Sequence, residues 1–244
     1  MLIVSENLSD LKAEVLSWKQ NNEVVGFVPT MGNLHEGHLS LISKIRRCGA
    51  TKTVVSIYVN PKQFGPEEDY SKYPRTLDED IKLLKKLNVD CVFCPSDKEI
   101  YPPNEKNLIT TNNPSLMSEL CGRQRPGHFY GVLLVVNKLM NIVRPDIAIF
   151  GQKDYQQYIL IKDMVQQLRE RAALIWDIDV DAVEWADGEA CPAGPNAGEF
   201  EPLTLADIAG KTLETGGPIN AKKSMNVQAP GPAFGTHIVD VEVD

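Results

Sequence analysis

Two histidines separated by a glutamate and a glycine have the residue types and spacing that best fit chemistry. His35 and His38 lie in the string PTMGNLHEGHL, and residues three apart share one side of a helix. The periodic apolar residues that follow predict a helix beginning near His35. Both imidazoles would then lie at a helix N-terminus, where free backbone N–H groups and the helix dipole favour an anion.

The residues between and before the histidines favour nucleotide binding over a metal site. Gly37 has no side chain, so a flat ring or a phosphate could approach the backbone. A zinc-protease motif, HExxH, needs histidines four positions apart, whereas these are three apart. Two functionless surface histidines are the plain alternative, but the same stretch also carries a strand, a turn and a glycine.

The elements that must position this pair alternate between strand and helix. Residues 24–28 form an apolar run that we expect to end at Pro29, because proline cannot continue a central strand ladder, and Gly32 and Asn33 supply the turn. The alternation predicts an α/β fold with a Rossmann-like parallel sheet and helices on both faces. The expected strands are 24–28, 53–59, 89–93 and 147–150, and the expected helices are 8–19, 77–87, 132–143 and 155–168.

Further candidates follow the other strands, at the sheet edge where α/β proteins bind ligands. Asn60 and Gln63 come after the second expected strand, and a buried glutamine amide can both donate and accept hydrogen bonds. Arg125 and His128 precede a helix and could hold an anion, although such an arginine is usually only solvated. After the fourth strand, Lys153 suits phosphate, and Asp154 suits either a helix cap or a ribose hydroxyl.

The helix expected over 77–87 carries apolar and acidic residues. We expect Leu77, Ile81 and Leu84 to face inward. The three acids of its first turn, Asp78, Glu79 and Asp80, are most simply partners of the helix dipole.

Composition narrows the functional class. The formal charge of −8 and pI near 5.1 argue against a nucleic-acid binder, and 43% hydrophobic residues among 244 suffice for a core. No apolar run approaches the ~20 residues that span a bilayer, and no secretion signal is seen, so we expect a cytoplasmic protein. The cysteine count is odd, and the CxxC of Cys91 and Cys94 lies at an apolar strand, which favours buried thiols.

Six motifs occur in order over residues 1–168: PTMGNLHEGH, VNPKQF, YPRTLDED, RPGHF, VRPD and FGQKDYQQ. HEGH resembles the HIGH signature of nucleotidyltransferases, and the set as a whole resembles the pantothenate synthetase (pantoate:beta-alanine ligase) family. The resemblance implies condensation of pantoate with beta-alanine through pantoyl adenylate, using ATP and Mg2+ and releasing AMP and pyrophosphate. It also implies small-molecule substrates and a homodimer, while the histidine spacing argues against a protein-bound metal site.

The resemblance also implies roles for particular residues. His38 would donate a proton, His35 would steady the triphosphate and Lys153 would reach the phosphates. Pantoate and beta-alanine would be held by Gln63, Gln157, Asn60 and Arg125. The ATP site would comprise Met31, Gly32, Asn33, Leu34, His35, Glu36, Gly37, His38, Gly151, Gln152, Lys153 and Asp154.

Beyond Leu168 the family motifs stop, so we divide the chain into a nucleotidyltransferase-like domain, 1–168, and an atypical tail, 169–244. The tail lacks the family's serine-arginine SSRN motif and resembles an internal segment of a xanthine dehydrogenase or aldehyde oxidase molybdenum-binding subunit. None of that family's cofactor motifs is present. We expect a chimera with an irregular tail that contains a turn at 185–188, a short helix over 203–211 begun by Thr204, and a strand over 236–243.

Three functions are compatible with these residues. The first is an AMP-forming ligase of the pantothenate synthetase kind, impaired by loss of the second half of its ATP clamp. The second is a catalytically inactive module that binds nucleotide or pantoate. The third, an adenylyl or cytidylyl transferase with HxGH, is disfavoured because NPKQF, RPGHF and KDYQQ indicate pantoate. A loop around residues 101–114 is the candidate cover of the site.

Overall fold

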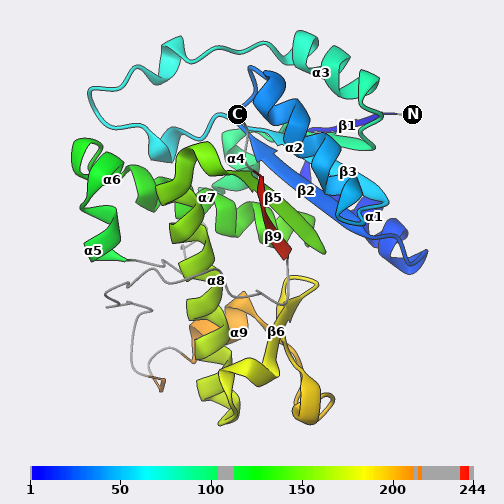
Figure 1. The fold of residues 1–244 in the computed structure, drawn as a ribbon, viewed down its shortest axis with the longest axis vertical. Coiled ribbons are helices and arrows are strands. Elements are labelled where there is room, and N and C mark those ends of the chain that lie inside the picture. The colour runs from blue at the N-terminus through cyan, green and yellow to red at the C-terminus, as the bar shows by residue number, and fades with distance from the viewer. Residues whose placement is uncertain (1, 104–112, 212–213, 216–236, 242–244) are drawn as a thin grey trace.

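A parallel six-stranded sheet forms the centre of the protein (Figure 1). The computed structural model describes residues 2–103, 113–211, 214–215 and 237–241. Every pair of neighbouring strands in this sheet runs parallel, which confirms the expected α/β class. In spatial order the strands are β1 (Ile3–Ser5), β4 (Cys91–Phe93), β3 (Lys52–Ile57), β2 (Val25–Thr30), β5 (Ile147–Gly151) and β9 (His237–Val241).

Helices cover both faces of the sheet. One face packs against α1 (Leu8–Gln20), α7 (His128–Val143) and the first half of α8 (Tyr155–Trp176). The other packs against α2 (Glu36–Arg47) and α3 (Leu77–Lys86). Successive strand residues point to opposite faces, so strands covered twice are almost continuously apolar, as in β2 and β3.

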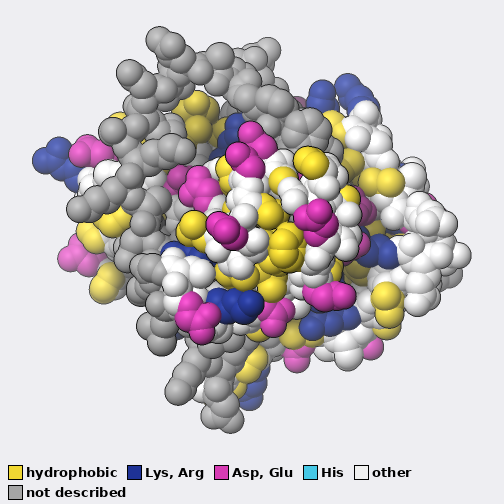
Figure 2. Space-filling view, turned by 90° about the horizontal axis from the view of Figure 1, so that it is seen from below, with side chains coloured by type: hydrophobic (Ala, Val, Ile, Leu, Met, Phe, Trp, Pro, Cys, Tyr) yellow, Lys and Arg dark blue, Asp and Glu magenta, His cyan; other side chains and the backbone are white. Residues whose placement is uncertain are grey.

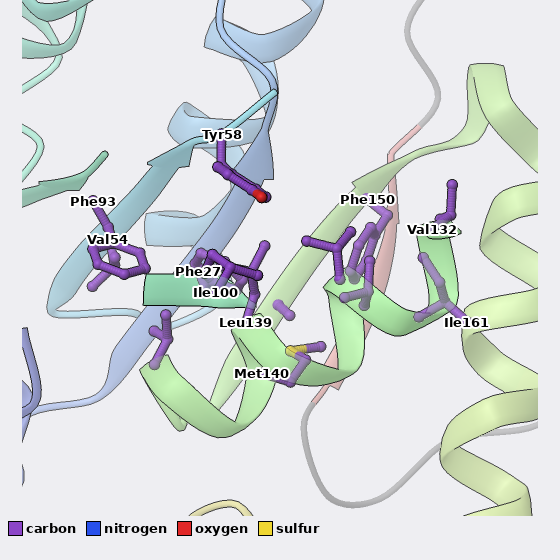
Figure 3. Packing of buried hydrophobic residues seen from close by; sticks show 14 of the residues in the cluster. Phe27, Val54, Tyr58, Phe93, Ile100, Val132, Leu139, Met140, Phe150 and Ile161 are labelled. Carbon is purple, nitrogen blue, oxygen red and sulfur yellow. The ribbon is translucent and has the colours of Figure 1, made fainter. Parts of the chain in front are cut away.

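The larger core lies between the sheet and α7 (Figure 3). Phe27 and Phe93 are fully buried on the strand side, and Leu139 and Met140 meet them from the helix. Each such side chain contributes about 1.5–3 kcal/mol when removed from water. This packing fixes α7 over the sheet and therefore fixes its N-terminus near the strand ends.

Pro29 lies inside β2, which corrects the expectation that the strand stops before it. Pairing of β2 with β5 covers only Gly26 and Phe27, whereas pairing with β3 continues to Thr30. Thr30 bonds to the β3 side through its carbonyl, which accepts from Tyr58 N. Because alternate residues of a strand bond to alternate neighbours, the missing N–H of Pro29 faces the side where pairing has already ended.

Several helix boundaries also differ from expectation. α7 begins at His128, and α8 runs on to Trp176 instead of ending near residue 168. Leu77 is exposed at the start of α3, because it precedes the first buried turn of that helix. Short helices join the main elements: α4 (Asp97–Ile100), α5 (Pro114–Met117) and α6 (Leu120–Gln124).

The described part of the tail forms a second, smaller lobe at the far end of α8 (Figure 1). It contains the antiparallel strands β6 (Val183–Ala186), β7 (Glu189–Pro192) and β8 (Leu203–Thr204), and helix α9 (Leu205–Gly210). This regular structure differs from the irregular tail that we expected. It forms because Trp185 and Ile208 pack with Trp176 of α8 into a separate apolar cluster. The second half of α8 supplies the apolar surface that a detached segment would lack.

The turn and helix expected in the tail are present. Asp187 and Gly188, with φ of 52° and 79°, join β6 to β7, and the two residues before them belong to β6. Thr204 caps α9 through a capping box with Asp207. The last expected strand is observed as β9, beside β5.

The tail lobe contacts the amino edge of the main sheet. Lys19, in the last turn of α1, pairs with Asp146, which directly precedes β5, and with Asp187 at the β6–β7 turn. The lobe carries no lysine or arginine between residues 172 and 210. Figure 2 shows this end of the molecule, where acidic side chains surround an apolar patch.

A close backbone contact links α7 to the loop after β3. A Cβ built on Gly131 would lie 2.1 Å from the carbonyl oxygen of Lys62 and 2.6 Å from Gln63 N. Lys62 and Gln63 belong to a short 3-10 helix, η1 (Pro61–Gln63). Only glycine allows the helix to approach this loop so closely.

We therefore expect Gly131→Ala to lower the free energy of unfolding by about 1–3 kcal/mol, because the methyl group must displace backbone atoms. Urea denaturation measures this loss. Gly210→Ala is the matched control, since a Cβ added there would meet no described atom within 4 Å. A Gly131→Ala protein as stable as the control would contradict the close contact.

Candidate active site

A cavity of about 780 Å³ opens at the carboxyl edge of the sheet. Its walls come from the ends of β2, β3 and β5, the first turns of α2, and α7. Of the expected site residues, eleven line it together: Met31, His35, Glu36, Gly37, His38, Asn60, Gln63, Gly151, Lys153, Asp154 and Gln157. Gly32, Asn33, Leu34, Gln152 and Arg125 do not line this cavity.

The two histidines cap α2 in a reciprocal manner. His35 is the N-cap residue, and its Nδ1 accepts from Gly37 N at 3.1 Å, while His38 Nδ1 accepts from His35 N at 3.4 Å. The ring centroids are 4.2 Å apart. A ring nitrogen that accepts carries no proton, so each neutral imidazole has its proton on Nε2. The pair thus offers two N–H donors beside the positive end of the helix dipole.

The surroundings of His38 keep it neutral. Burial lowers the pKa of His38 below 6.5, and the neighbouring His35 lowers it further. Asp80 and Asp154 act in the opposite direction and raise the pKa, but less strongly. His38 is therefore a hydrogen-bond donor at neutral pH rather than a cation.

Gln63 is held by a chain of buried amides and hydroxyls. Tyr101 Oη donates to Asn60 Oδ1 at 2.8 Å, and Asn60 Nδ2 donates to Gln63 Oε1 at 3.1 Å and to Gly131 O at 3.0 Å. Gln63 Nε2 has only the weak acceptor Met31 Sδ, at 2.8 Å, among the described residues. The chain leaves the Gln63 amide N–H groups available to a stronger acceptor in the cavity. Asn60, 1% exposed, lines the cavity and orients Gln63.

The residues after β5 form the opposite wall. Asp154 is the N-cap residue of α8 but makes no side-chain capping bond to the described residues, so its carboxylate remains available to the cavity. Lys153 is 83% exposed, and its Nζ lies 3.6 Å from Asp154 Oδ1. Such an exposed amine can swing toward a bound anion at little cost.

Arg125, a candidate ligand for pantoate or beta-alanine, is paired with Glu68 in this structure. Its guanidinium binds both carboxylate oxygens of Glu68, one of them through NH2 at 3.0 Å, and NH1 lies 3.1 Å from His128 Nε2. His128 Nδ1 in turn lies 2.8 Å from Gln63 O. The arginine's hydrogen bond lowers the pKa of Glu68 to about 2. RPGHF therefore fastens the loop that carries Gln63.

Sequence reasoning missed several residues of the site. Tyr58, Tyr73 and Ser40 line the cavity, and α7 gives it an apolar wall of Val132, Val135, Val136 and Leu139. Asp80 is also missed, because it is buried under the turn before α2 and not exposed at a helix end. The sequence does carry a sign of this burial. Asp80 lies four positions before the buried Leu84, which places both residues on the apolar side of α3.

Other expectations concern features away from the cavity. Both CxxC thiols are free; Cys91 is buried, and burial raises the pKa of both to about 12. The described residues contain no group of three or more metal-ligating side chains and no helix able to cross a membrane. The expected cover, around 101–114, falls largely on residues 104–112, which lie outside the described residues.

The two partly buried histidines predict a pH-dependent stability. The pKa of His38 and that of His128 are both lowered from 6.5, mainly by burial. The unfolded chain therefore binds more protons below pH 6.5, and we expect the free energy of unfolding to fall as the pH drops from 6.5 through the lowered folded-state values. Urea denaturation between pH 8 and pH 5.5 measures this, with His38→Asn/His128→Asn as the comparison. An equally steep loss in the double variant would contradict it.

We expect substitutions of Glu68 and Arg125 to have non-additive effects on the free energy of unfolding. Their side chains are 32% and 38% exposed, so we expect a coupling free energy of about 0.5–1 kcal/mol in a cycle of Glu68→Gln, Arg125→Lys and the double variant. The Lys72–Asp69 pair, whose lysine is 84% exposed, is the control, where a cycle of Lys72→Gln and Asp69→Asn should give no measurable coupling. Strictly additive effects at Glu68 and Arg125 would show that the two residues act separately.

Comparisons with known sequences agree with this arrangement. The pantothenate synthetase of Hydrogenovibrio crunogenus is 48% identical over 174 residues, which cover 71% of this chain and 61% of that protein. The pantothenate synthetase of Acetivibrio thermocellus is 51% identical over 172 residues, covering 70% of this chain and 60% of that one. The chain thus spans less than two thirds of the length of these relatives.

Solved structures match the same region. Pantothenate synthetase from Thermus thermophilus superposes with a TM-score of 0.63 at 42% identity, covering 68% of this chain and 58% of that one. Pantoate-beta-alanine ligase from Francisella tularensis, complexed with beta-gamma ATP and beta-alanine, gives 0.63 at 43% identity, covering 68% and 62%. The sequence model described as Pantoate-beta-alanine ligase matches residues 3–188, which extends past the expected join at 168 into β6 and its turn. Over these residues, the chain belongs to the pantoate-beta-alanine ligase family.

Proposed function

We propose that this chain catalyses the ATP-dependent condensation of (R)-pantoate with beta-alanine to pantothenate. Pantoate would first attack ATP to form pantoyl adenylate and pyrophosphate, and the amine of beta-alanine would then displace AMP. One observation carries the proposal: two Nε2–H imidazoles at the α2 N-terminus share a cavity with the amide of Gln63. The family membership and the ATP and beta-alanine bound to the Francisella tularensis relative support it.

The first step needs positive potential and correct placement more than a protein nucleophile. When the pantoate carboxylate attacks the α-phosphorus, negative charge builds on the phosphate oxygens and the leaving pyrophosphate. His38 and His35 would donate Nε2–H bonds to these oxygens, and Lys153 would swing in as a mobile cation. Because the donors are fixed by capping bonds to α2, they need no reorganisation during the reaction.

Pantoate binding would use polar and apolar parts of the cavity. Gln63 would donate from Nε2, which Asn60 directs away from itself, and Gln157 would contribute a second amide. The apolar wall from α7 would accept the hydrocarbon part of the acid. Met31 and the residues after β5 from Gly151 to Asp154 would complete the ATP site.

Mg2+ fits the donor set as an ion carried by the nucleotide. It is usually bound through phosphates and one or two carboxylates, and the cavity wall offers the carboxylates of Glu36 and Asp154. Bound there, Mg2+ would neutralise triphosphate charge.

The alternative is a chain that binds nucleotide or pantoate without turnover. Two observations are consistent with this alternative. The chain spans about 60% of the length of its relatives, and the tail lobe contacts the amino edge of the sheet, opposite the cavity. No SSRN motif is present in the sequence to complete the triphosphate contacts. Loss of such charge-stabilising groups costs about 10²–10³ in rate.

The wider setting of the chain is part of the proposal. We place it in the cytoplasm, as a homodimer acting on small molecules, with no nucleic-acid or membrane partner. We also propose that the chain divides into a catalytic domain, 1–168, and a tail, 169–244, of which the residues beyond 188 lie outside the family match and resemble the molybdenum-binding subunit segment. The helix α8 crosses that division.

The test is pantoate-dependent release of pyrophosphate from ATP and Mg2+, with and without beta-alanine. We expect release that requires pantoate, increases with beta-alanine and yields pantothenate. His38→Ala should lower the rate by about 10²–10³, because it removes a donor to the developing charge. Circular dichroism confirms that the variant is folded.

Each outcome separates the two functions. Pantoate-dependent pyrophosphate that disappears in His38→Ala supports the ligase. Equal signal in wild type and variant would refute the role of His38. No signal in folded wild type, together with ATP binding detected by calorimetry, would establish the binding-only alternative.

A further inference from the structure

A buried carboxylate lies behind the turn that leads into α2. Asp80, in the first turn of α3, is 2% exposed. Its Oδ2 accepts from Asn33 N at 2.9 Å, and its Oδ1 accepts from Leu34 N at 2.8 Å. Thr76 Oγ1 adds a third bond to Oδ2 at 3.2 Å. One side chain thus joins α3 to a turn more than forty residues earlier in the chain.

The turn adopts a conformation that needs external support. Gly32 and Asn33 are consecutive left-handed residues, with φ of 80° and 52°. Glycine adopts this region freely, but asparagine does so at some cost, and two in succession are uncommon. The chain is also tight against the carboxylate, since a Cβ on Gly32 would lie 3.1 Å from Asp80 Oδ2. The carboxylate therefore stabilises the backbone at the place where it is most constrained.

The turn decides where the histidines point. Leu34 directly precedes His35, the N-cap residue, and His38 is the N3 residue of the same helix. Both imidazoles accept bonds from backbone N–H groups at the start of α2. A shift of the Gly32–Asn33 turn would move the start of α2 and with it both Nε2–H donors. A charged acceptor bonded to two adjacent backbone N–H groups is among the stronger devices for holding a loop.

We propose that Asp80 is a positioning residue for the nucleotide site: its carboxylate clamps the left-handed Gly32–Asn33 turn and thereby sets the direction of the His35 and His38 imidazoles toward phosphate. This rests on the proposed ATP-binding function and specifies which group outside the cavity maintains it. Asp78 and Glu79, beside it on α3, are exposed, and among the described residues neither accepts a bond from the turn. Asp78 is therefore a matched control.

The test compares Asp80→Asn with Asp78→Asn in the full chain. An amide offers one acceptor oxygen where the carboxylate offers two, and its NH2 would face a backbone N–H. We expect ATP affinity, measured by calorimetry, to fall about ten- to a hundredfold for Asp80→Asn and less than about twofold for Asp78→Asn.

Histidine ¹⁵N NMR supplies a readout that does not require ATP binding. The sequence has four histidines, so their ring signals can be assigned by substitution. We expect Asp80→Asn to move the His35 and His38 signals and to lower the pKa of His38. Burial, His35 and Lys153 lower this pKa in the folded protein, whereas Asp80 and Asp154 raise it, so removing the Asp80 charge removes one of the two opposing effects. A structural role remote from the histidines would leave these signals unchanged.

The outcomes are distinct. Weak ATP binding with shifted His35 and His38 signals supports the clamp, whereas affinity within twofold of Asp78→Asn and unmoved signals overturn it. Wild-type protein that fails to bind ATP refutes the proposed function, while the NMR comparison still decides the clamp. If Asp80→Asn does not fold, Asp80→Glu replaces it, since it keeps the charge but displaces the carboxylate from the turn: shifted histidine signals support the clamp, and unchanged signals overturn it.

Discussion

Parallel pairing of β2 with β3 and β5 is the constraint on which the site depends. Because these strands point the same way, the turns that follow them meet at one edge of the sheet. The histidines after β2, Gln63 after β3 and the Gly151–Asp154 segment after β5 thereby come to line one cavity, although more than a hundred residues separate the first from the last. The apolar faces of the sheet, covered by α1 and α7 on one side and by α2 and α3 on the other, make this alignment stable.

Much of this could be predicted from the sequence, because local patterns determine it. Apolar runs indicate β2 to β5, and the periodic apolar residues after the HEGH string indicate a helix that begins near His35, as α2 does. The features that the sequence does not predict depend on contacts between residues far apart in the chain. The place of Pro29 within β2 depends on how far β5 extends alongside, and the engagement of Arg125 depends on Glu68, 57 residues away. The position of Asp80 in a first turn indicates only a dipole partner, because the groups that it binds lie across the fold.

Polar groups beneath the cavity hold its hydrogen-bond donors in place. Several residues fix the donors through hydrogen bonds within the protein: Asn60 and Tyr101 orient the Gln63 amide, and His128 lies against the Gln63 backbone carbonyl. Such supporting groups look like ordinary loop residues in a sequence, since only their mutual distances reveal the role. The tail shows the converse case. Its composition indicates an irregular segment, yet the apolar stripe of α8 gives Trp185 and Ile208 a surface on which to pack.

The continuity of α8 bears on how the two lobes can be separated. This 22-residue helix, about 33 Å long, contributes Ile161 and Met164 to the main core and Ala172 and Trp176 to the smaller one. Leu168, where the family motifs end, is 3% exposed in its middle. A protease therefore finds no linker at this point, and cutting the chain there would open both cores at once. The two lobes thus share one continuous helix, despite their different sequence character.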